Sequence, residues 1–205
     1  MLDFYYADSG NSLRAAIALE ESGVTYNAHR LDLAAGEHKT PDFLALNPQG
    51  TVPTLIERSA DGTATITLTQ SAAIVTFAAE TAGDFLPQDR AARAEVMRWF
   101  MVAVTDAQPT SQLLLYLTKN VPDFSEAGQR YLTQRWLDTM RPVEARLAGR
   151  GGAYLCDAFS IADIALYPVI RIRRHLLEQH GAFPHLLEWA DRVGDRPAVR
   201  RALAA

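Results

Sequence analysis

The chain of 205 residues holds one cysteine, Cys156. A single cysteine excludes an internal disulfide framework and a zinc site built from several cysteine thiolates. An excess of positive charge is missing too, because 20 lysine and arginine residues stand against 24 aspartate and glutamate residues, for a formal net charge of −4. Nucleic-acid binding usually leaves a basic patch or stripe in the sequence. We therefore expect no nucleic-acid partner.

Long hydrophobic runs are also absent. No stretch of the sequence approaches the ~20 apolar residues that are needed to cross a bilayer. The residues after Met1 alternate as in a strand and do not resemble a secretory signal. We expect a cytoplasmic protein without membrane contact. Hydrophobic residues make up 48 % of the chain, which is enough for a folded core in one large or two modest domains.

The first eighty residues alternate strand and helix signals. Leu2, Phe4 and Tyr6 have the spacing of a short strand, and residues 26–31 predict a second. Residues 54–57 and 65–69 predict a hairpin around Asp61-Gly62. Helices are predicted after the turn at residues 8–12, from Thr40-Pro41, and after residue 71, whose serine we expect to be the N-cap. The predicted order is β-α-β-α-β-β-α.

Strand signals end before a polar break at residues 83–89, which contains Pro87. Helices are predicted at residues 90–119, 125–147, 160–179 and 184–193, with a short one from residue 197. Pro109 and Pro168 should kink or break their helices. We expect an α/β domain at residues 1–82, a linker at 83–89 and an all-helical domain at 90–205. Ser160 and Asp163 have the spacing of a capping box, which we interpret as a stability feature.

Two segments of the first domain suit a ligand. Residues 47–53, Asn-Pro-Gln-Gly-Thr-Val-Pro, lead directly into a strand. Pro53 cannot donate to a strand ladder, and it can turn the backbone of Val52 toward an extended, peptide-like ligand. Gln70-Ser71 begins a helix, whose first turn presents unpaired N–H groups and partial positive charge to a carboxylate. The alternative interpretations are that residues 47–53 are an ordinary loop and that Ser71 is only a helix cap.

Together with the capping box, these segments give a family resemblance. The Val52-Pro53 turn, the Gln70-Ser71 helix start and the Ser160–Asp163 box stand in the order and spacing of the cytosolic glutathione S-transferases, and the opening residues are most similar to bacterial members. The resemblance covers nearly the whole chain. It implies the glutathione S-transferase fold, an α/β thioredoxin-like N-terminal domain followed by an all-α C-terminal domain. It also implies a cis Val52–Pro53 bond, a homodimer, glutathione as a substrate and no metal.

The resemblance also assigns roles to residues. Val52, next to Pro53, would pair its backbone with the cysteinyl part of glutathione. Gln70 and Ser71 would hold the γ-glutamyl end, and His38 and Gln49 are candidates for the glycyl end.

The resemblance implies a donor to the glutathione sulfur in the turn at residues 8–12, where Ser9, Asn11 and Ser12 are the candidates. Beta-type bacterial relatives have a cysteine where Asn11 stands, so their mixed-disulfide chemistry should be absent here. Other bacterial relatives, active in disulfide-bond reduction, have a hydroxyl residue and an asparagine that match Ser9 and Asn11. All three candidates are also ordinary turn and N-cap residues.

The function that we expect first is that of a glutathione S-transferase, the transfer of the glutathione thiolate to a small hydrophobic electrophile held by the helical domain, and two alternatives stand beside it. One is glutathione-dependent reduction of disulfides or peroxides. The other is glutathione binding without catalysis, because a fold alone does not determine function.

Overall fold

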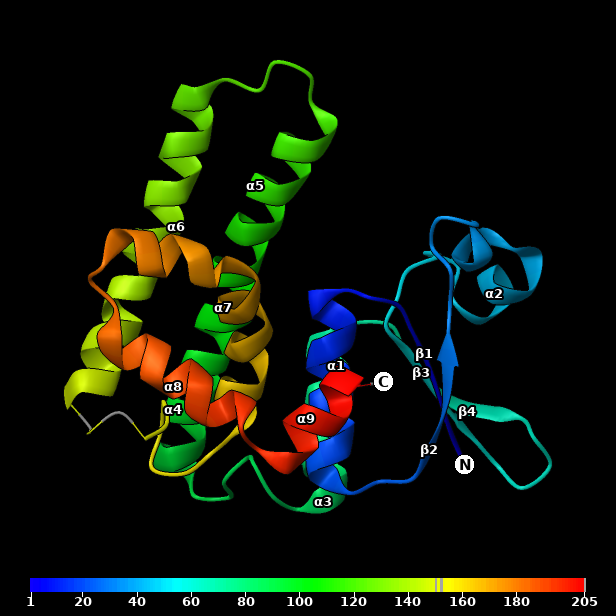
Figure 1. Cartoon of the computed structure of the whole chain (residues 1–205). Helices are drawn as coiled ribbons and strands as arrows, with labels where there is room; N and C mark the ends of the chain where they lie inside the picture. Colours follow the sequence, from blue (N-terminus) through cyan, green and yellow to red (C-terminus); the bar gives the residue numbers. More distant parts are fainter. Residues whose placement is uncertain (150, 152, 205) are drawn as a thin grey trace. The chain divides into compact units, whose positions relative to one another are not determined.

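The computed structural model describes residues 1–149, 151 and 153–204 (Figure 1). Its internal contacts divide the chain into two compact units. The first contains residues 1–84 and the C-terminal helix, and the second contains residues 85–196. No helix in these described stretches is long and apolar enough to cross a membrane.

The first unit is built on a four-stranded sheet of order β2-β1-β3-β4, in which β1 and β2 are parallel and the other pairs antiparallel. The predicted order β-α-β-α-β-β-α is confirmed, with one additional 3-10 turn, Glu37–Lys39, before the second helix. The elements are β1 (Leu2–Tyr6), α1 (Gly10–Ser22), β2 (Tyr26–Arg30), α2 (Pro41–Leu46), β3 (Thr54–Arg58), β4 (Ala64–Leu68) and α3 (Ser71–Ala82).

The two faces of the sheet carry different residues, because successive side chains of a strand point to opposite sides. Phe4 is 1 % exposed and contacts Tyr26, whose hydroxyl donates to Glu20 of α1 at 2.7 Å. This face is therefore covered by α1, beside which α3 and α9 are drawn in Figure 1. On the other face Tyr5 stacks on His29 and contacts Phe43 of α2.

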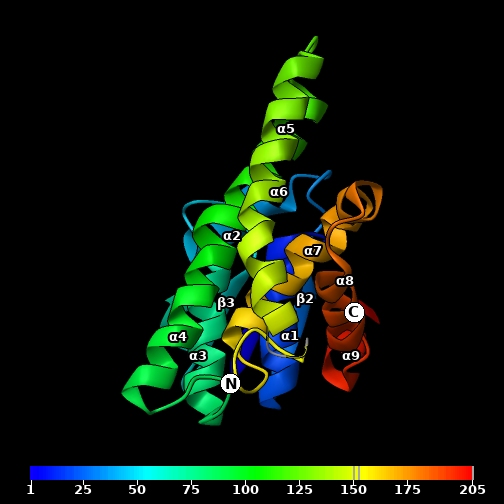
Figure 2. The ribbon, with the colours of Figure 1, turned by 90° about the vertical axis from the view of Figure 1, so that its left-hand side faces the viewer.

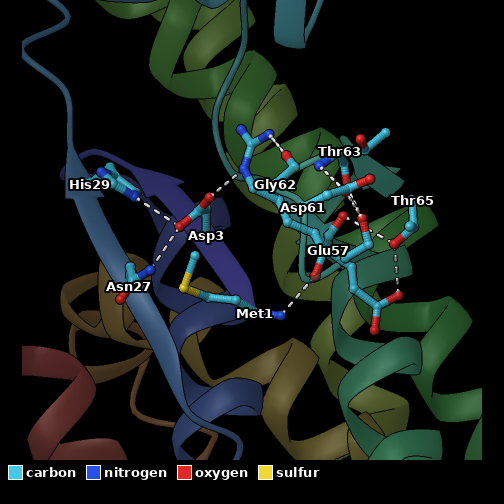
Figure 3. Close-up of polar contacts among 11 residues, drawn as sticks. Met1, Asp3, Asn27, His29, Glu57, Asp61, Gly62, Thr63 and Thr65 are labelled. Atoms are coloured by element: carbon cyan, nitrogen blue, oxygen red, sulfur yellow. Dashed lines mark hydrogen bonds and ion pairs between the residues drawn. The ribbon is translucent and has the colours of Figure 1, made fainter.

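A polar cluster around Asp3 joins three strands on that second face (Figure 3). The Asp3 carboxylate accepts hydrogen bonds from Asn27 at 2.9 Å and from Arg58 Nε at 2.7 Å, and it lies 3.3 Å from His29 Nε2. The Asn27 bond first, then those of Arg58 and His29, lower the pKa of Asp3 to about 2 against the opposing effect of burial. Asp3 is thus ionised at neutral pH and holds β2, β1 and β3 in register.

The second unit is helical. It contains α4 (Arg90–Met101), a π-helical segment (Val102–Ala107), α5 (Gln108–Asn120), α6 (Glu126–Gly149), α7 (Ile161–His180) and α8 (Pro184–Gly194). α5 and α6 pack side by side in both views (Figures 1 and 2). The expected irregularity at Pro109 corresponds to the π-helical segment, which ends two residues earlier. Pro168 does not break its helix, because α7 runs through it without interruption.

The predicted capping box is present at the start of α7. Asp163 accepts hydrogen bonds from the backbone N–H groups of Ser160 at 3.1 Å and Leu155 at 3.0 Å. It also accepts from the indole of Trp189 in α8 at 2.8 Å. Burial raises the pKa of this carboxyl to about 6, although the hydrogen bonds oppose that shift. Asp163 therefore connects the start of α7 to the loop at Leu155 and to α8, in addition to capping its own helix.

The last helix, α9 (Pro197–Ala204), packs on α1 and groups with the first unit. Arg201 Nε lies 2.6 Å from a carboxylate oxygen of Glu20. Residues 90–205 were expected to form one helical domain, whereas α9 packs on α1 and groups with residues 1–84. The pattern of a short amphipathic helix does not reveal which of two surfaces it covers.

Candidate functional site

The turn after β1 is organised by two serines. Ser9 is the N-cap of α1, and its hydroxyl oxygen accepts from the Ser12 N–H at 3.1 Å. The Ser9 hydroxyl also donates to Ser12 Oγ at 3.0 Å, and Ser12 Oγ accepts from the Ala7 N–H at 3.3 Å. Ser12 is only 2 % exposed. Of the three predicted catalytic residues, Ser12 thus lies inside the turn and supports it, and Ser9 has its hydroxyl engaged in the cap.

Asn11 differs from the two serines in what it offers to a ligand. Its side-chain oxygen accepts a hydrogen bond from Arg14 Nη1 at 2.9 Å, and the residue is half-buried. A guanidinium can only donate, so this contact fixes the orientation of the amide. The Nδ2 group, with two N–H donors, is therefore turned away from Arg14.

Arg14 was not recognised as a site residue from the sequence. Its side chain is buried, with the residue 2 % exposed, and Nη1 also donates to the hydroxyl oxygen of Ser71 at 3.0 Å. Burial lowers the pKa of Arg14 to about 10, which leaves the guanidinium charged at neutral pH. The sequence did contain a signal that could have identified Arg14. It lies three residues after Asn11 on the buried face of a predicted helix, where charged residues are rare unless they are paired.

The start of α3 lies one residue earlier than we expected. Gln70 is the N-cap of α3 and makes no side-chain cap bond, and Ser71 is the first helical residue. The prediction that Ser71 caps the helix was wrong because its hydroxyl, 7 % exposed as a residue, binds Arg14 of α1 instead. The Gln70 side chain is exposed. The first turn of α3 thus receives no capping bond from the Gln70 side chain.

The loop before β3 is held by Asn47, which is 0 % exposed. Its Nδ2 donates to the Thr51 carbonyl at 2.8 Å and to Thr54 Oγ1 at 3.1 Å, and its Oδ1 accepts from the Gln49 N–H at 3.1 Å. From the sequence, Asn47 was expected only as part of the loop that leads into a strand. A buried amide that closes a loop on itself has no signature in spacing or composition.

The Val52–Pro53 bond is cis, as the resemblance implied. Val52 is half-buried and Pro53 is buried. The structure thus fixes the turn, while its role in binding stays a prediction.

The segments that carry His38 and Gln49 meet at Gly50. Gly50 has φ +56°, and a Cβ there would lie 2.8 Å from the His38 carbonyl oxygen. His38 Nδ1 is enclosed and has no hydrogen-bond partner among the described residues, while the Gln49 side chain is exposed. Lys39 Nζ donates to the Gly50 carbonyl at 2.8 Å, which is a second contact between the two segments.

The sheet register places these segments at one edge. Tyr5, next to the end of β1, pairs with Thr54 at the start of β3. Leu55 pairs with Leu68 at the end of β4, just before the start of α3. The turn at residues 7–12, the loop at 47–53 and the start of α3 therefore lie at the same edge of the sheet, and Arg14 joins the first to the third.

Two family profiles match the chain. Residues 8–81 match "Glutathione S-transferase, N-terminal domain", and residues 106–205 match "Glutathione S-transferase, C-terminal domain".

Relatives match over almost the full length. The chain is 30 % identical over 210 residues to glutathione S-transferase 3 of Zea mays, covering 96 % of this chain and 90 % of that one. It is 28 % identical over 207 residues to the disulfide-bond oxidoreductase YfcG of Escherichia coli (strain K12), covering 99 % and 94 %. A glutathione transferase of Burkholderia graminis, solved with two glutathione molecules per subunit, superposes with a TM-score of 0.87 at 29 % identity, covering 100 % and 88 %. The chain belongs to the glutathione S-transferase family.

Proposed function

We propose that this protein binds glutathione at the described edge of the sheet and uses its thiolate to reduce disulfides. The observation that carries the proposal is the amide of Asn11, whose oxygen is held by Arg14 so that its N–H donors face away from the protein's own guanidinium. The turn supplies no thiol, because the single cysteine of the chain is Cys156. The nucleophile is therefore the sulfur of glutathione.

Three contacts would hold the tripeptide. The backbone of Val52 pairs with the cysteinyl part, as an added strand pairs with a sheet edge. The N–H groups at the start of α3, with Gln70 and Ser71, take the γ-glutamyl carboxylate at the positive end of the helix. His38 and Gln49, on segments that meet at Gly50, would take the glycyl carboxylate.

Ionisation of the thiol is the step that the turn would assist. A cysteine-type thiol has a pKa of about 8.5, so only a few per cent is thiolate at neutral pH. A lowering by ~2 units makes the thiolate the majority form and corresponds to about 2.7 kcal/mol of differential stabilisation. Hydrogen bonds to charged groups contribute about 1.5–3 kcal/mol each. One N–H of Asn11 Nδ2, donated to the sulfur, can therefore supply most of the shift.

The chemistry balances with two glutathione molecules. The first thiolate attacks one sulfur of the substrate disulfide, forms a glutathionyl mixed disulfide and releases one substrate thiolate. A second glutathione thiolate attacks the glutathione sulfur of that mixed disulfide, releasing the other substrate thiolate and forming glutathione disulfide. The Escherichia coli relative named as a disulfide-bond oxidoreductase and the Burkholderia graminis relative with two bound glutathione molecules support this reaction.

The second candidate is transfer of the same thiolate to a small hydrophobic electrophile, with the helical unit holding that substrate in a homodimer. It is favoured by the identity to the Zea mays glutathione S-transferase. Apolar side chains of the first helices of this unit, such as Met101 and Tyr116, are exposed to 43 % and 52 % and are available to such a substrate.

Calorimetric titration with glutathione tests the binding site. We expect micromolar to millimolar affinity for the wild type and a loss of about tenfold, ~1.4 kcal/mol, in Gln70→Ala. Gln70 is exposed and makes no cap bond, so the substitution should leave folding intact. Gln134→Ala, on an exposed face of α6, is the matched control and should bind as the wild type. Absence of binding by the wild type would overturn the proposal.

A parallel assay separates the two reactions. The wild type is given glutathione with a model disulfide in one series and with an aryl halide in the other. Turnover of the disulfide is expected, with Asn11→Ala slower by about tenfold or more. Turnover of the aryl halide alone would refute disulfide reduction and support thiolate transfer. Turnover of neither substrate would indicate glutathione binding without catalysis.

A further inference from the structure

The helical unit contains a cavity of about 340 Å³ between α7 and α8. On its α7 side the lining residues Tyr167, Ile170, Arg171 and Arg174 stand three or four positions apart, so they share one face of the helix. On the other side the cavity is lined by the last turns of α8. None of these residues belongs to the turns and loops assigned to glutathione.

The hydroxyl of Tyr167 lies at this cavity and has no hydrogen-bond partner in the described part of the chain. The residue is only 6 % exposed. A nearly buried hydroxyl without a partner carries a desolvation cost that phenylalanine would avoid. Burial, the largest cause, raises the pKa of Tyr167, while Arg171 lowers it and Asp191 raises it. The hydroxyl therefore keeps its proton at neutral pH and is available as a donor.

Gly194, the last residue of α8, makes room for this hydroxyl. Its backbone is not in the left-handed region, and alanine is preferred to glycine inside a helix. A Cβ at this position would lie only 2.9 Å from the Tyr167 hydroxyl oxygen. The glycine is therefore explained by the space that it leaves at the cavity, and not by the conformation of the chain.

Arg171 is the cation of the cavity that pairs with no carboxylate among the described residues. Its side chain is exposed, and it lies one helical turn from Tyr167. Arg174 is engaged, because it bonds Glu178 and both carboxylate oxygens of Asp191. A single anionic group can thus accept from the Tyr167 hydroxyl and from the Arg171 guanidinium together.

We propose that the cavity between α7 and α8 binds a small carboxylate with an apolar body. The carboxylate accepts hydrogen bonds from Tyr167 and Arg171, and the apolar body lies against Ile170 and Ala190, which also line the cavity. The volume is at the lower end of the range of small-molecule pockets, which suits a ligand of this size. The inference goes beyond the proposed function, because it requires neither glutathione nor any residue of that site.

The α8 side of the cavity limits the charge of the ligand. Asp191 and Asp195 line it, and the C-terminal end of a helix carries partial negative charge. Asp191 is balanced by Arg174, but the side as a whole repels a dianion more strongly than a monoanion. A monocarboxylate should therefore bind better than a phosphate dianion.

The test is a titration of the wild-type chain, followed by NMR chemical-shift changes, with three probes. Phenylacetate should bind with a millimolar Kd. Phenylacetamide has nearly the same shape without the charge and should bind at least tenfold more weakly, as should inorganic phosphate. Absence of phenylacetate binding, equal affinity for the acid and the amide, or tighter binding of phosphate would overturn the proposal.

Substitutions locate the bound carboxylate. Tyr167→Phe should weaken phenylacetate binding about tenfold, while its melting temperature stays at or above that of the wild type, because the lost hydroxyl had no partner. Arg171→Met should weaken it about fivefold. Arg135→Met, which removes an exposed arginine of α6, is the matched control and should bind as the wild type. Wild-type affinity in Tyr167→Phe, or an equal loss in Arg135→Met, would refute the assignment.

Two further variants separate this cavity from the glutathione site. Gly194→Ala places a methyl group against the Tyr167 hydroxyl and should weaken phenylacetate binding by about tenfold or more. Gln70→Ala should leave that affinity unchanged, and a loss there would place the probe at the glutathione site and overturn the inference. If the wild type binds phenylacetate in this way but binds no glutathione, the proposed function alone fails. If it binds glutathione but no phenylacetate, this inference alone fails.

Discussion

Replacing Asn11 by aspartate changes a single group in the site and should raise the pKa of the bound thiol. The two side chains have the same shape, so the carboxylate of Asn11→Asp can keep the 2.9 Å bond to Arg14 through one oxygen. Its second oxygen then replaces the Nδ2 donor. An acceptor carrying negative charge thus faces the sulfur, where the wild type presents two N–H groups.

The magnitude follows from two contributions. Loss of a hydrogen bond to a charged partner removes about 1.5–3 kcal/mol of thiolate stabilisation. Repulsion between two unit charges about 4 Å apart adds ~4 kcal/mol at an effective dielectric constant of 20. The guanidinium of Arg14, in contact with the new carboxylate, offsets most of that repulsion. We expect a net rise of the thiol pKa by about 1–2 units, to the range of free glutathione.

The assay is the pH titration of thiolate absorbance in the glutathione complex, together with the pH profile of disulfide turnover. Both midpoints should move up together in Asn11→Asp, and Asn11→Ala should move them about half as far, since it removes the donor without adding charge. Asn120→Asp, at the exposed end of α5, makes the same change of net charge and should move neither. An unchanged or lowered thiol pKa in Asn11→Asp would refute the assignment of Asn11 as the donor.

Three further predictions concern the fold that holds the site. Asp163→Ala should lower the free energy of unfolding, measured by urea titration, by about 3–5 kcal/mol, because it leaves buried donors, among them the Trp189 indole, without an acceptor. A loss below about 1 kcal/mol would contradict this. Since the pKa of Asp3 is lowered from 3.8 to about 2, its contribution of about 2.4 kcal/mol should be complete above pH ~5 and be lost as the pH falls through ~2, and Asp3→Asn should lack this slope. Gly50→Ala should weaken glutathione binding and destabilise the chain by about 1–3 kcal/mol, since the new Cβ would meet the His38 carbonyl at φ +56°; calorimetry and thermal melts that match the wild type would refute it.

The sequence predicted the elements well because their signals are local. The alternation of Leu2, Phe4 and Tyr6 and the spacing of Ser160 and Asp163 depend on neighbours along the chain, and these elements and the capping box are confirmed. The family was recognisable for a related reason, since its motifs are short and stand at fixed spacing.

What the sequence did not predict depends on contacts between segments that are distant along the chain. Ser71 was expected to cap its own helix, yet its hydroxyl binds Arg14, 57 residues earlier. The structural role of Asn47 is a set of bonds to its own loop, visible only when the loop is closed. Ser9, Asn11 and Ser12 are all common turn residues, so the sequence does not distinguish their roles. Their hydrogen bonds do: Ser12 supports the turn from inside, and the oxygen of the Asn11 amide is held by Arg14.

The packing of α9 on α1 has a consequence for how the protein is made. The first unit contains the candidate site, but one of its helices, α9, is synthesised only after residues 85–196, and Glu20 meets Arg201 across 181 positions of sequence. The surface of α1 that α9 covers therefore stays exposed while residues 85–196 are synthesised, and domains normally fold as they emerge. A chain shortened before Pro197 would keep every residue of the candidate site. It would lack α9, which packs on α1, the helix that carries Asn11 and Arg14.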